Sequence, residues 1–506
     1  MKSKAGNRRL VGIGIVVFWL AMMGWLASRE LGVQTLDSGN TSADRARRPT
    51  DTWMAVRMAS GQRVGHVHMA TRPETRDAVE GARMSLQAAL RLELMGRATD
   101  LDLEGWVWRP FEDPGATFQF NVRSADYDFH VDGAVGDGRL AGEVTSAGET
   151  IPLDFPVEDT LLFGSGFGAT LELPLLEVGE EYRIETFDPL TLSRGKARVR
   201  CVAKETLELS GESIETRHLT VDLGGLVSHA WIDDDGEVVR AETPVGLTLE
   251  RSTAAEVARA RLEVRGDAEE FLDLTAIKPT GERPFRGAAT MTVQLSGMEP
   301  GTLGQLPVGD VQEALGDGRY RLTVPAEPDG EVVDSATPAD FEAHLAADPF
   351  VQSGHPKIQD RASQILDEAG LADSADPWQR ALAIHEWVYL RLDKEAVVSI
   401  PSALEVLENR RGDCNEHTVL FTALARAVDI PTRIVIGVVW SDDLDGFYYH
   451  AWPEVWVGDQ WLWMDPTLGQ PQADATHFAL LRGGIEQWPQ LLPYLGQLEM
   501  EILEIR

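Results

Sequence analysis

The sequence predicts an α+β protein in which antiparallel β-rich domains precede a smaller mixed domain. In the first half of the chain, Gly and Asp-Gly turns separate alternating apolar segments, which is typical of antiparallel sheet. From about residue 338 the apolar period becomes helical, and near residue 450 an alternating hairpin follows a strongly apolar helix. The chain has 506 residues, 43% of them hydrophobic, and so is long enough for about two to four domains with their own cores.

Residues 1–30 are predicted to form a signal anchor, a single transmembrane helix. Four basic residues among the first nine precede an uncharged run, 11–27, that approaches the length needed to cross a bilayer. This run is longer than a usual signal-peptide core and contains bulky tryptophans, so we expect an anchor rather than a cleaved signal. The basic flank should stay on the cytoplasmic side of the membrane. The bulk of the chain is then periplasmic or extracellular, attached to the inner, cytoplasmic membrane.

A polar linker is expected over residues 31–51, and a β-rich domain of half-barrel or sandwich type over 52–265. Cys201 lies in the alternating segment RVRCVAK, where a small core residue is expected. The net charge of −35 argues against nucleic-acid binding, because phosphate contacts need clustered basic residues. Since this region shows no catalytic spacing, its expected role is to select a substrate or to bind an envelope protein partner.

A small β segment, 266–340, is expected before the mixed domain, 341–506. Asp376 and Pro377 are placed to begin a helix whose apolar stripe includes His385. On that stripe, His385 is expected to be a core histidine with its hydrogen bonds satisfied rather than a ligand.

The stretch RRGDCNEHTVLFTALARAV places Cys414 at the start of a helix that is apolar nearly all round. Gly412 gives the backbone freedom to turn, and Asp413 is placed as the cap. Unpaired N–H groups and the positive end of the helix dipole favour an anion there. The pKa of the Cys414 thiol is therefore expected to fall below its ordinary value. Taken alone, Cys414 fits a core position equally well.

The hairpin YYHAWPEVWVGDQWLWMDPT supplies a base and a group to orient it. If residues 458–459 form a two-residue turn, Trp456 lies opposite Trp461. Opposite residues point to the same face, so His450 and Asp465 become diagonal neighbours with backbones about 7–8 Å apart. A hydrogen bond between a histidine and a carboxylate can close that distance.

The sequence therefore predicts a catalytic triad. Cys414 is the nucleophile, His450 acts as general base and then acid, and Asp465 holds the imidazole tautomer. The backbone N–H of Cys414 is the expected oxyanion donor. Trp452 and Trp463 are candidates for the lining of the cleft.

A metal site is an alternative for the same residues. Cys414 and His417 are three residues apart on the helix, and with His450 and Asp465 they would complete a tetrahedral zinc set. They would share only the first helical turn, and the triad needs no metal. We therefore expect neither a metal nor a cofactor.

The segments GDCNEHTVLFTALARAVDIPTRIVIG and HAWPEVWVGDQWLWMDPT resemble the bacterial transglutaminase-like superfamily, over about residues 375–470. The order Cys, His, Asp and the intervals of 36 and 15 residues suit that family. The resemblance implies a papain-like core, in which the helix bearing the cysteine packs on an antiparallel sheet. It also implies acyl transfer at amides through a thioester. Crosslinking transglutaminases have Gln before and Trp after the cysteine, so the GDC of this chain weakens the crosslinking interpretation.

Two functions remain open. One is a membrane-anchored, extracytoplasmic thiol enzyme that hydrolyses or transfers amide bonds of a protein or peptide substrate. The other is a catalytically silent scaffold or binding protein in an envelope assembly. The intact triad favours the enzyme, because a silent protein has no need of all three residues. The size of the β-rich region keeps the scaffold open.

Overall fold

The computed structural model describes residues 47–506 except 59, 95–96, 114, 125–126, 147, 158–160, 164–174, 189–191, 210, 224–225, 244–245, 261–275, 298–305, 329–340, 396–401, 485–486, 488–493 and 495–496. The predicted signal anchor and most of the predicted linker lie outside the described residues. Among the residues that are described, no helix is long and apolar enough to span a membrane.

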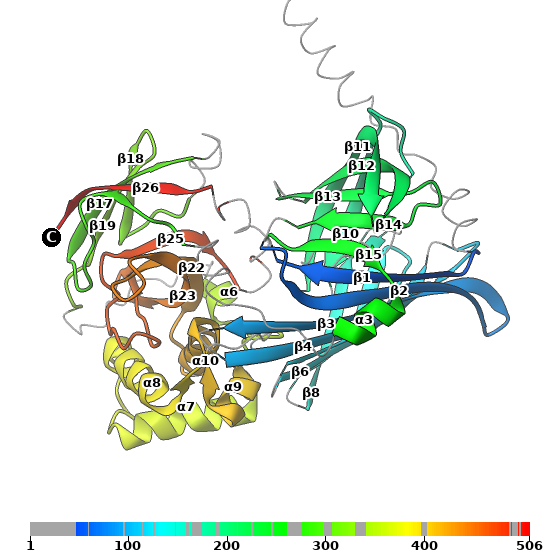
Figure 1. Ribbon diagram of the computed structural model, residues 1–506. Coiled ribbons are helices and arrows are strands. Elements are labelled where there is room, and N and C mark those ends of the chain that lie inside the picture. The colour runs from blue at the N-terminus through cyan, green and yellow to red at the C-terminus, as the bar shows by residue number, and fades with distance from the viewer. Residues whose placement is uncertain are drawn as a thin grey trace, which may run out of the picture.

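A 15-stranded sheet forms the β-rich region (Figure 1). One antiparallel meander runs from β1 to β8, and a second brings β15 back beside β1. Strands β9 and β10 pair in parallel. Burial alternates along the strands, and Cys201 in β11 is fully buried in a small core, as predicted. The elements are β1 (Thr50–Arg57), β2 (Arg63–Arg76), β3 (Val79–Leu94), β4 (Arg97–Pro110), β5 (Ala116–Ser124), β6 (Tyr127–Gly136), β7 (Arg139–Ser146), β8 (Glu149–Pro156), β9 (Leu161–Phe163), β10 (Glu181–Asp188), β11 (Ser193–Leu209), β12 (Glu212–Leu223), β13 (Leu226–Ile232), β14 (Val238–Glu242), β15 (Thr248–Ser252) and α3 (Ala254–Ala260).

The mixed domain is built on a four-stranded antiparallel sheet in the order β24-β23-β22-β25. Apolar residues of β22 and β23, among them Ile434 and Val455, share a core with the helices α7, α8, α9 and α10. Asp376 caps α8, as predicted, by accepting hydrogen bonds from the N–H groups of Trp378 and Gln379. The elements are α6 (Phe341–Leu345), α7 (Pro356–Glu368), α8 (Pro377–Arg391), β20 (Asp393–Lys394), α9 (Ala403–Asn409), β21 (Arg411–Gly412), α10 (Cys414–Arg426), β22 (Thr432–Ser441), β23 (Gly446–Val457), β24 (Gln460–Trp463) and β25 (His477–Arg482).

A smaller five-stranded sheet, ordered β16-β26-β17-β19-β18, packs on the other face of the four-stranded sheet. Trp452 and Phe478 of the four-stranded sheet share one core with Met291 and Tyr320 of the smaller one. The predicted small β segment therefore does not stand alone, because β26 comes from the far end of the mixed domain and completes its sheet (Figure 1). The strands are β16 (Thr280–Gly281), β17 (Thr290–Ser296), β18 (Gln312–Gly316), β19 (Arg319–Thr323) and β26 (Glu499–Ile505).

Gly437 in β22 marks a close approach of two backbones. A Cβ at this position would lie 2.0 Å from the carbonyl oxygen of Phe478 in β25 and 2.8 Å from the ring of Trp452. Gly437 is paired with His450 in β23. A side chain at residue 437 would therefore disturb the strand that carries the candidate base.

We expect Gly437→Ala to lower the free energy of unfolding by about 1–3 kcal/mol, the usual cost of overpacking, as measured by urea unfolding. Gly354→Ala is the matched control, because a Cβ there would meet nothing within 4 Å. The control should change the free energy of unfolding by less than about 0.5 kcal/mol. Equal effects at the two positions would contradict the close approach.

Candidate active site

Cys414 is the first residue of α10, and the residues before it form the predicted cap. The Asp413 carboxylate accepts a hydrogen bond from the Asn415 N–H at 2.9 Å, while the Glu416 carboxylate accepts one from the Asp413 N–H at 2.8 Å. A Cβ on Gly412 would lie 2.3 Å from Cβ of Glu416, so glycine is required there. This capping box fixes the position of the cysteine.

The start of α10 is joined to β23 at Ala451, the residue after His450. The Thr418 hydroxyl donates a hydrogen bond to the Ala451 carbonyl oxygen at 3.0 Å, and the Ala451 backbone N–H is directed to the Cys414 sulfur. Strand β24 pairs with β23 no further back than Glu454, which leaves the backbone of Ala451 to the helix. The helix that bears the cysteine thus packs against the strand that bears the histidine.

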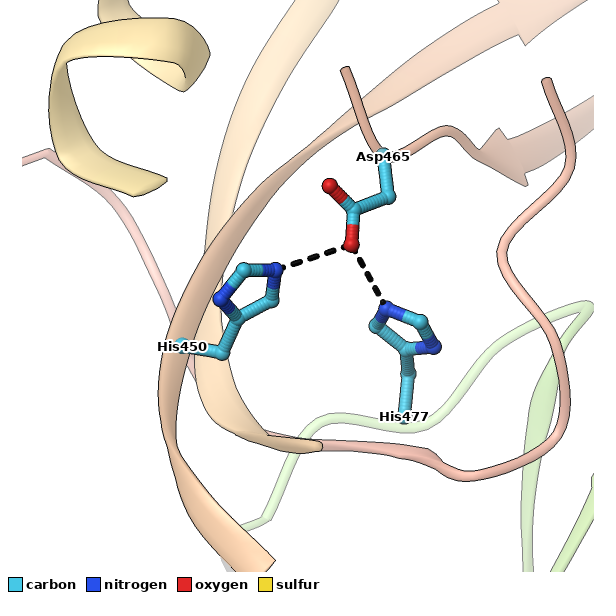
Figure 2. A group of neighbouring side chains, drawn as sticks. All are labelled: His450, Asp465 and His477. Atoms are coloured by element: carbon cyan, nitrogen blue, oxygen red, sulfur yellow. Dashed lines mark hydrogen bonds and ion pairs between the residues drawn. The ribbon is translucent and has the colours of Figure 1, made fainter. Parts of the chain in front are cut away.

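The hairpin register is as predicted, with Trp456 opposite Trp461. Beyond the ladder, Nε2 of His450 donates a hydrogen bond of 2.8 Å to Oδ2 of Asp465 (Figure 2). The carboxylate can only accept, so Nε2 carries the proton, and Nδ1 of a neutral His450 is left with its lone pair. This tautomer leaves Nδ1 of His450 able to accept a proton.

Asp465 is fully buried and accepts four hydrogen bonds. Its Oδ1 receives the backbone N–H groups of Thr467 and Leu468 at 2.8 and 2.9 Å, and its Oδ2 receives the imidazoles of His450 and His477 at 2.8 and 3.1 Å. Burial alone would raise the pKa of Asp465, but the two imidazoles hold it well below its ordinary value. The carboxylate is therefore ionised and fixed in orientation.

His477 opens β25 and is missing from the sequence-based prediction. Its Nε2 lies 3.1 Å from Oδ2 of Asp465, and its Nδ1 lies 3.1 Å from the carbonyl oxygen of Asp474 (Figure 2 shows the contact with Asp465). Burial would lower the pKa of His477, but the two aspartates raise it above the ordinary value. The one signal in the sequence is a histidine at the head of the apolar run THFALL, shortly after the Asp-Pro-Thr motif.

The protonation state of Cys414 differs from the expectation. Burial raises the pKa of the thiol well above its ordinary value, and the Asp413 carboxylate adds to the rise, while the hydrogen bond from Ala451 opposes it. Desolvation thus raises the pKa of Cys414 by more than the helix terminus lowers it, and the sequence-based prediction depended on the helix terminus. The resting residue is therefore a thiol.

The structure does not assemble the alternative zinc set. Nδ1 of His417 donates to the Asp413 carbonyl oxygen at 2.7 Å, and within the described residues the three potential ligand atoms that gather within 4.8 Å belong to His450, Asp465 and His477. Both imidazole Nε2 atoms of that group face one carboxylate oxygen at hydrogen-bond distances, and Oδ1 is already occupied by two N–H groups. The contacts within this group are hydrogen bonds.

The two tryptophans and His385 are all buried. Trp452 and Trp463 were expected to line the cleft, but their exposures are 0% and 2%, so both fill the core between the two sheets and offer no surface to a bound peptide. His385 is a buried core histidine, as predicted, and its Nε2 donates a hydrogen bond to the Asp465 carbonyl oxygen at 3.0 Å. Burial lowers the pKa of His385, so this ring is neutral.

Residues 366–466 match the transglutaminase-like superfamily. The chain is also similar to a proposed cysteine protease from Cytophaga hutchinsonii, with 16% identity over 44% of this chain and 85% of that one and a TM-score of 0.29. A β-barrel-like protein from Brucella abortus, whose domain has no known function, has 9% identity over 41% of this chain and 97% of that one, with a TM-score of 0.30. A proposed protease from Parabacteroides distasonis has 12% identity over 56% of this chain and 66% of that one, with a TM-score of 0.19. No curated protein matches the chain. The three structural similarities are distant, so the site geometry and the superfamily match carry the functional conclusion.

A buried charge cluster holds the hairpin that carries His450. Glu454 is 1% exposed and accepts hydrogen bonds from Arg433, from Arg482 at 3.0 and 3.1 Å, and from the Trp463 indole at 2.9 Å. Burial would raise the pKa of Glu454, but the two arginines lower it below the ordinary value. The stabilisation from Glu454 is therefore present above about pH 4.3 and is lost as the pH falls through the lowered pKa.

Glu454→Gln should lower the free energy of unfolding by about 3 kcal/mol at pH 7, because the partly buried guanidinium groups of Arg433 and Arg482 lose a buried counter-charge. The difference from the parent should shrink as the pH falls below about 4. Urea unfolding across this pH range measures both effects. Glu313→Gln, which breaks an exposed pair with Arg321, is the control and should cost less than about 1 kcal/mol.

Proposed function

We propose that this protein is a thiol enzyme that acts on peptide or isopeptide amide bonds through a thioester on Cys414. One observation carries the proposal: the buried His450–Asp465 hydrogen bond lies directly beside the point where the first turn of α10 meets β23. The match of residues 366–466 to the transglutaminase-like superfamily supports the same chemistry.

The chemistry begins with the Cys414 thiol, whose pKa is raised by burial. Nδ1 of His450 accepts the thiol proton as the sulfur attacks the amide carbonyl carbon, and the resulting imidazolium is stabilised by Asp465. The oxyanion of the tetrahedral intermediate accepts a hydrogen bond from the Cys414 backbone N–H at the positive end of α10. His450 then protonates the leaving amine as the C–N bond breaks, which leaves an acyl thioester. Water or a second amine resolves the thioester and returns the thiol.

The backbone N–H of Cys414 suits the oxyanion role for a structural reason. The N–H groups of Asn415 and His417 are satisfied by the side chain and the carbonyl of Asp413. Within the described part of the chain, no acceptor is bonded to the N–H of Cys414, which is therefore available to a substrate oxygen.

We also propose a cellular location for the enzyme and a partner for its β-rich region. The uncharged run 11–27 with its basic flank supports attachment to the inner membrane, with the enzyme on the outer side. The substrate is then a protein or peptide of that compartment. The 15-stranded sheet would select the substrate or bind an envelope protein partner.

A substrate-independent test is the rate at which iodoacetamide alkylates Cys414, followed by mass spectrometry of the Cys414 peptide. We expect His450→Ala to slow the reaction at pH 7 by about tenfold or more, because the thiol, whose pKa is raised by desolvation, must then ionise without a base. Equal rates in the two proteins would favour the silent scaffold over the enzyme.

Turnover is tested on a library of fluorogenic peptide amides and isopeptides. Cys414→Ala should reduce turnover by about a thousandfold or more, while Cys201→Ala, which changes a core residue of another sheet, should leave it unchanged. An acid-quenched sample should carry the acyl group on the Cys414 peptide. Addition of a primary amine separates a hydrolase, which yields the acid, from a transferase, which yields the new amide.

A further inference from the structure

His477 makes hydrogen bonds that a neutral imidazole cannot make. A neutral ring has one donor and one acceptor nitrogen, but Nε2 of His477 faces the Asp465 carboxylate and Nδ1 faces the carbonyl oxygen of Asp474. Both of these oxygens only accept, so both ring nitrogens must donate. The imidazolium is the form that satisfies the two contacts, and the Asp474 carboxylate, 3.4 Å from Nδ1, supplies a second counter-charge.

Asp474 is itself anchored by the segment that precedes β17 of the smaller sheet. Its carboxylate is 3.3 Å from the Arg286 guanidinium and accepts a hydrogen bond from the Gly287 N–H at 2.9 Å. The Ala475 N–H donates to the Ala288 carbonyl oxygen at 2.9 Å. A continuous chain of contacts thus joins residues 286–288, which lie outside the matched superfamily region, to Asp465.

We propose that His477 is a positioning residue of this site: a lasting imidazolium, held by Asp474 and Arg286, that keeps the Asp465 carboxylate ionised and oriented beneath His450. Since the triad needs an ionised Asp465, the proposal rests on the proposed function for its catalytic consequence. The charges alternate along Asp465, His477, Asp474 and Arg286 and sum to zero. A carboxylate with no exposure can therefore stay ionised without an excess buried charge.

The pKa directions agree with this geometry, since that of His477 is raised and those of Asp465 and Asp474 are lowered. The effect of His477 can be separated from the other groups around it. The titratable groups that act on Asp465, or on which it acts, are His450 of β23, His477 of β25, His385 of α8, and Cys414 and His417 of α10. Those acting on His477 are Asp465 and Asp474, and the ring of His450 lies 5.9 Å from its ring.

The test is the pH profile of iodoacetamide alkylation at Cys414 in the full chain. His477→Gln keeps a hydrogen-bond donor but removes the positive charge of the imidazolium. The ring of His477 lies 5.9 Å from the ring of His450. At an effective dielectric constant of about 20, the acid-side midpoint of the profile should move to higher pH by about one to two units. Loss of the charge favours protonation of the hydrogen-bonded pair His450–Asp465, so the site loses its base at a higher pH.

The matched control is His385→Gln. This change removes another buried histidine that bonds to Asp465, but the His385 ring is neutral and contacts the backbone carbonyl. Its alkylation rate can fall, but the midpoint of the profile should stay in place. If His477→Gln and His385→Gln have the same midpoint as the parent, His477 is only a packing residue and the proposal is overturned.

A second measurement needs no variant and covers the case in which His477→Gln does not fold. Hydrogen–deuterium exchange at the imidazole C2 position, resolved by peptide, reports the protonation of each histidine in the parent. His477 should still be an imidazolium above pH 6.5, the ordinary histidine pKa, and a midpoint at or below that value overturns the proposal. If the parent and His450→Ala have identical alkylation profiles, the proposed function fails, while the exchange midpoint still decides the charge of His477.

Discussion

The site depends on a buried carboxylate that is kept charged. Asp465 has no solvent exposure, yet its two oxygens accept four hydrogen bonds, two from backbone N–H groups and two from imidazoles. An ionised carboxylate buried without such partners would take up a proton instead. The loop after β24, the head of β25 and the hairpin all converge on this one group, and their relative placement is what gives His450 its tautomer.

The second constraint is the junction between the helical layer and the sheet. The capping box holds the first turn of α10, and the hydroxyl of Thr418 fixes that turn to Ala451. Because β24 is short, the backbone of β23 next to His450 bonds to the helix instead of to a further strand. Cys414 and His450 are therefore placed by two backbone contacts at Ala451, and not by the length or flexibility of their side chains.

Local rules were enough to predict the cap at Asp413, the helix start at Asp376 and the hairpin pairing of Trp456 with Trp461, because each is set by neighbours in the sequence. Burial was harder to predict. The pKa of Cys414 is raised because desolvation outweighs the helix terminus, and the tryptophans expected in a cleft fill a core, because a second sheet covers that face. His477 was missed because its role comes from a loop that folds back on Asp465, a contact that periodicity does not encode.

Strand β26 must pair with strands that come much earlier in the chain. It lies between β16 and β17, and its residue Glu499 bonds to Ser296, 203 residues earlier in the chain. Non-local pairing of this kind is slow, because the entropy of closing a long loop is lost before the contacts form. The helices and the hairpin can associate soon after they leave the ribosome, whereas the smaller sheet, next to the turn that carries Arg286, cannot be completed until β26 has been made. Completion of the smaller sheet therefore follows the synthesis of Cys414, His450 and Asp465.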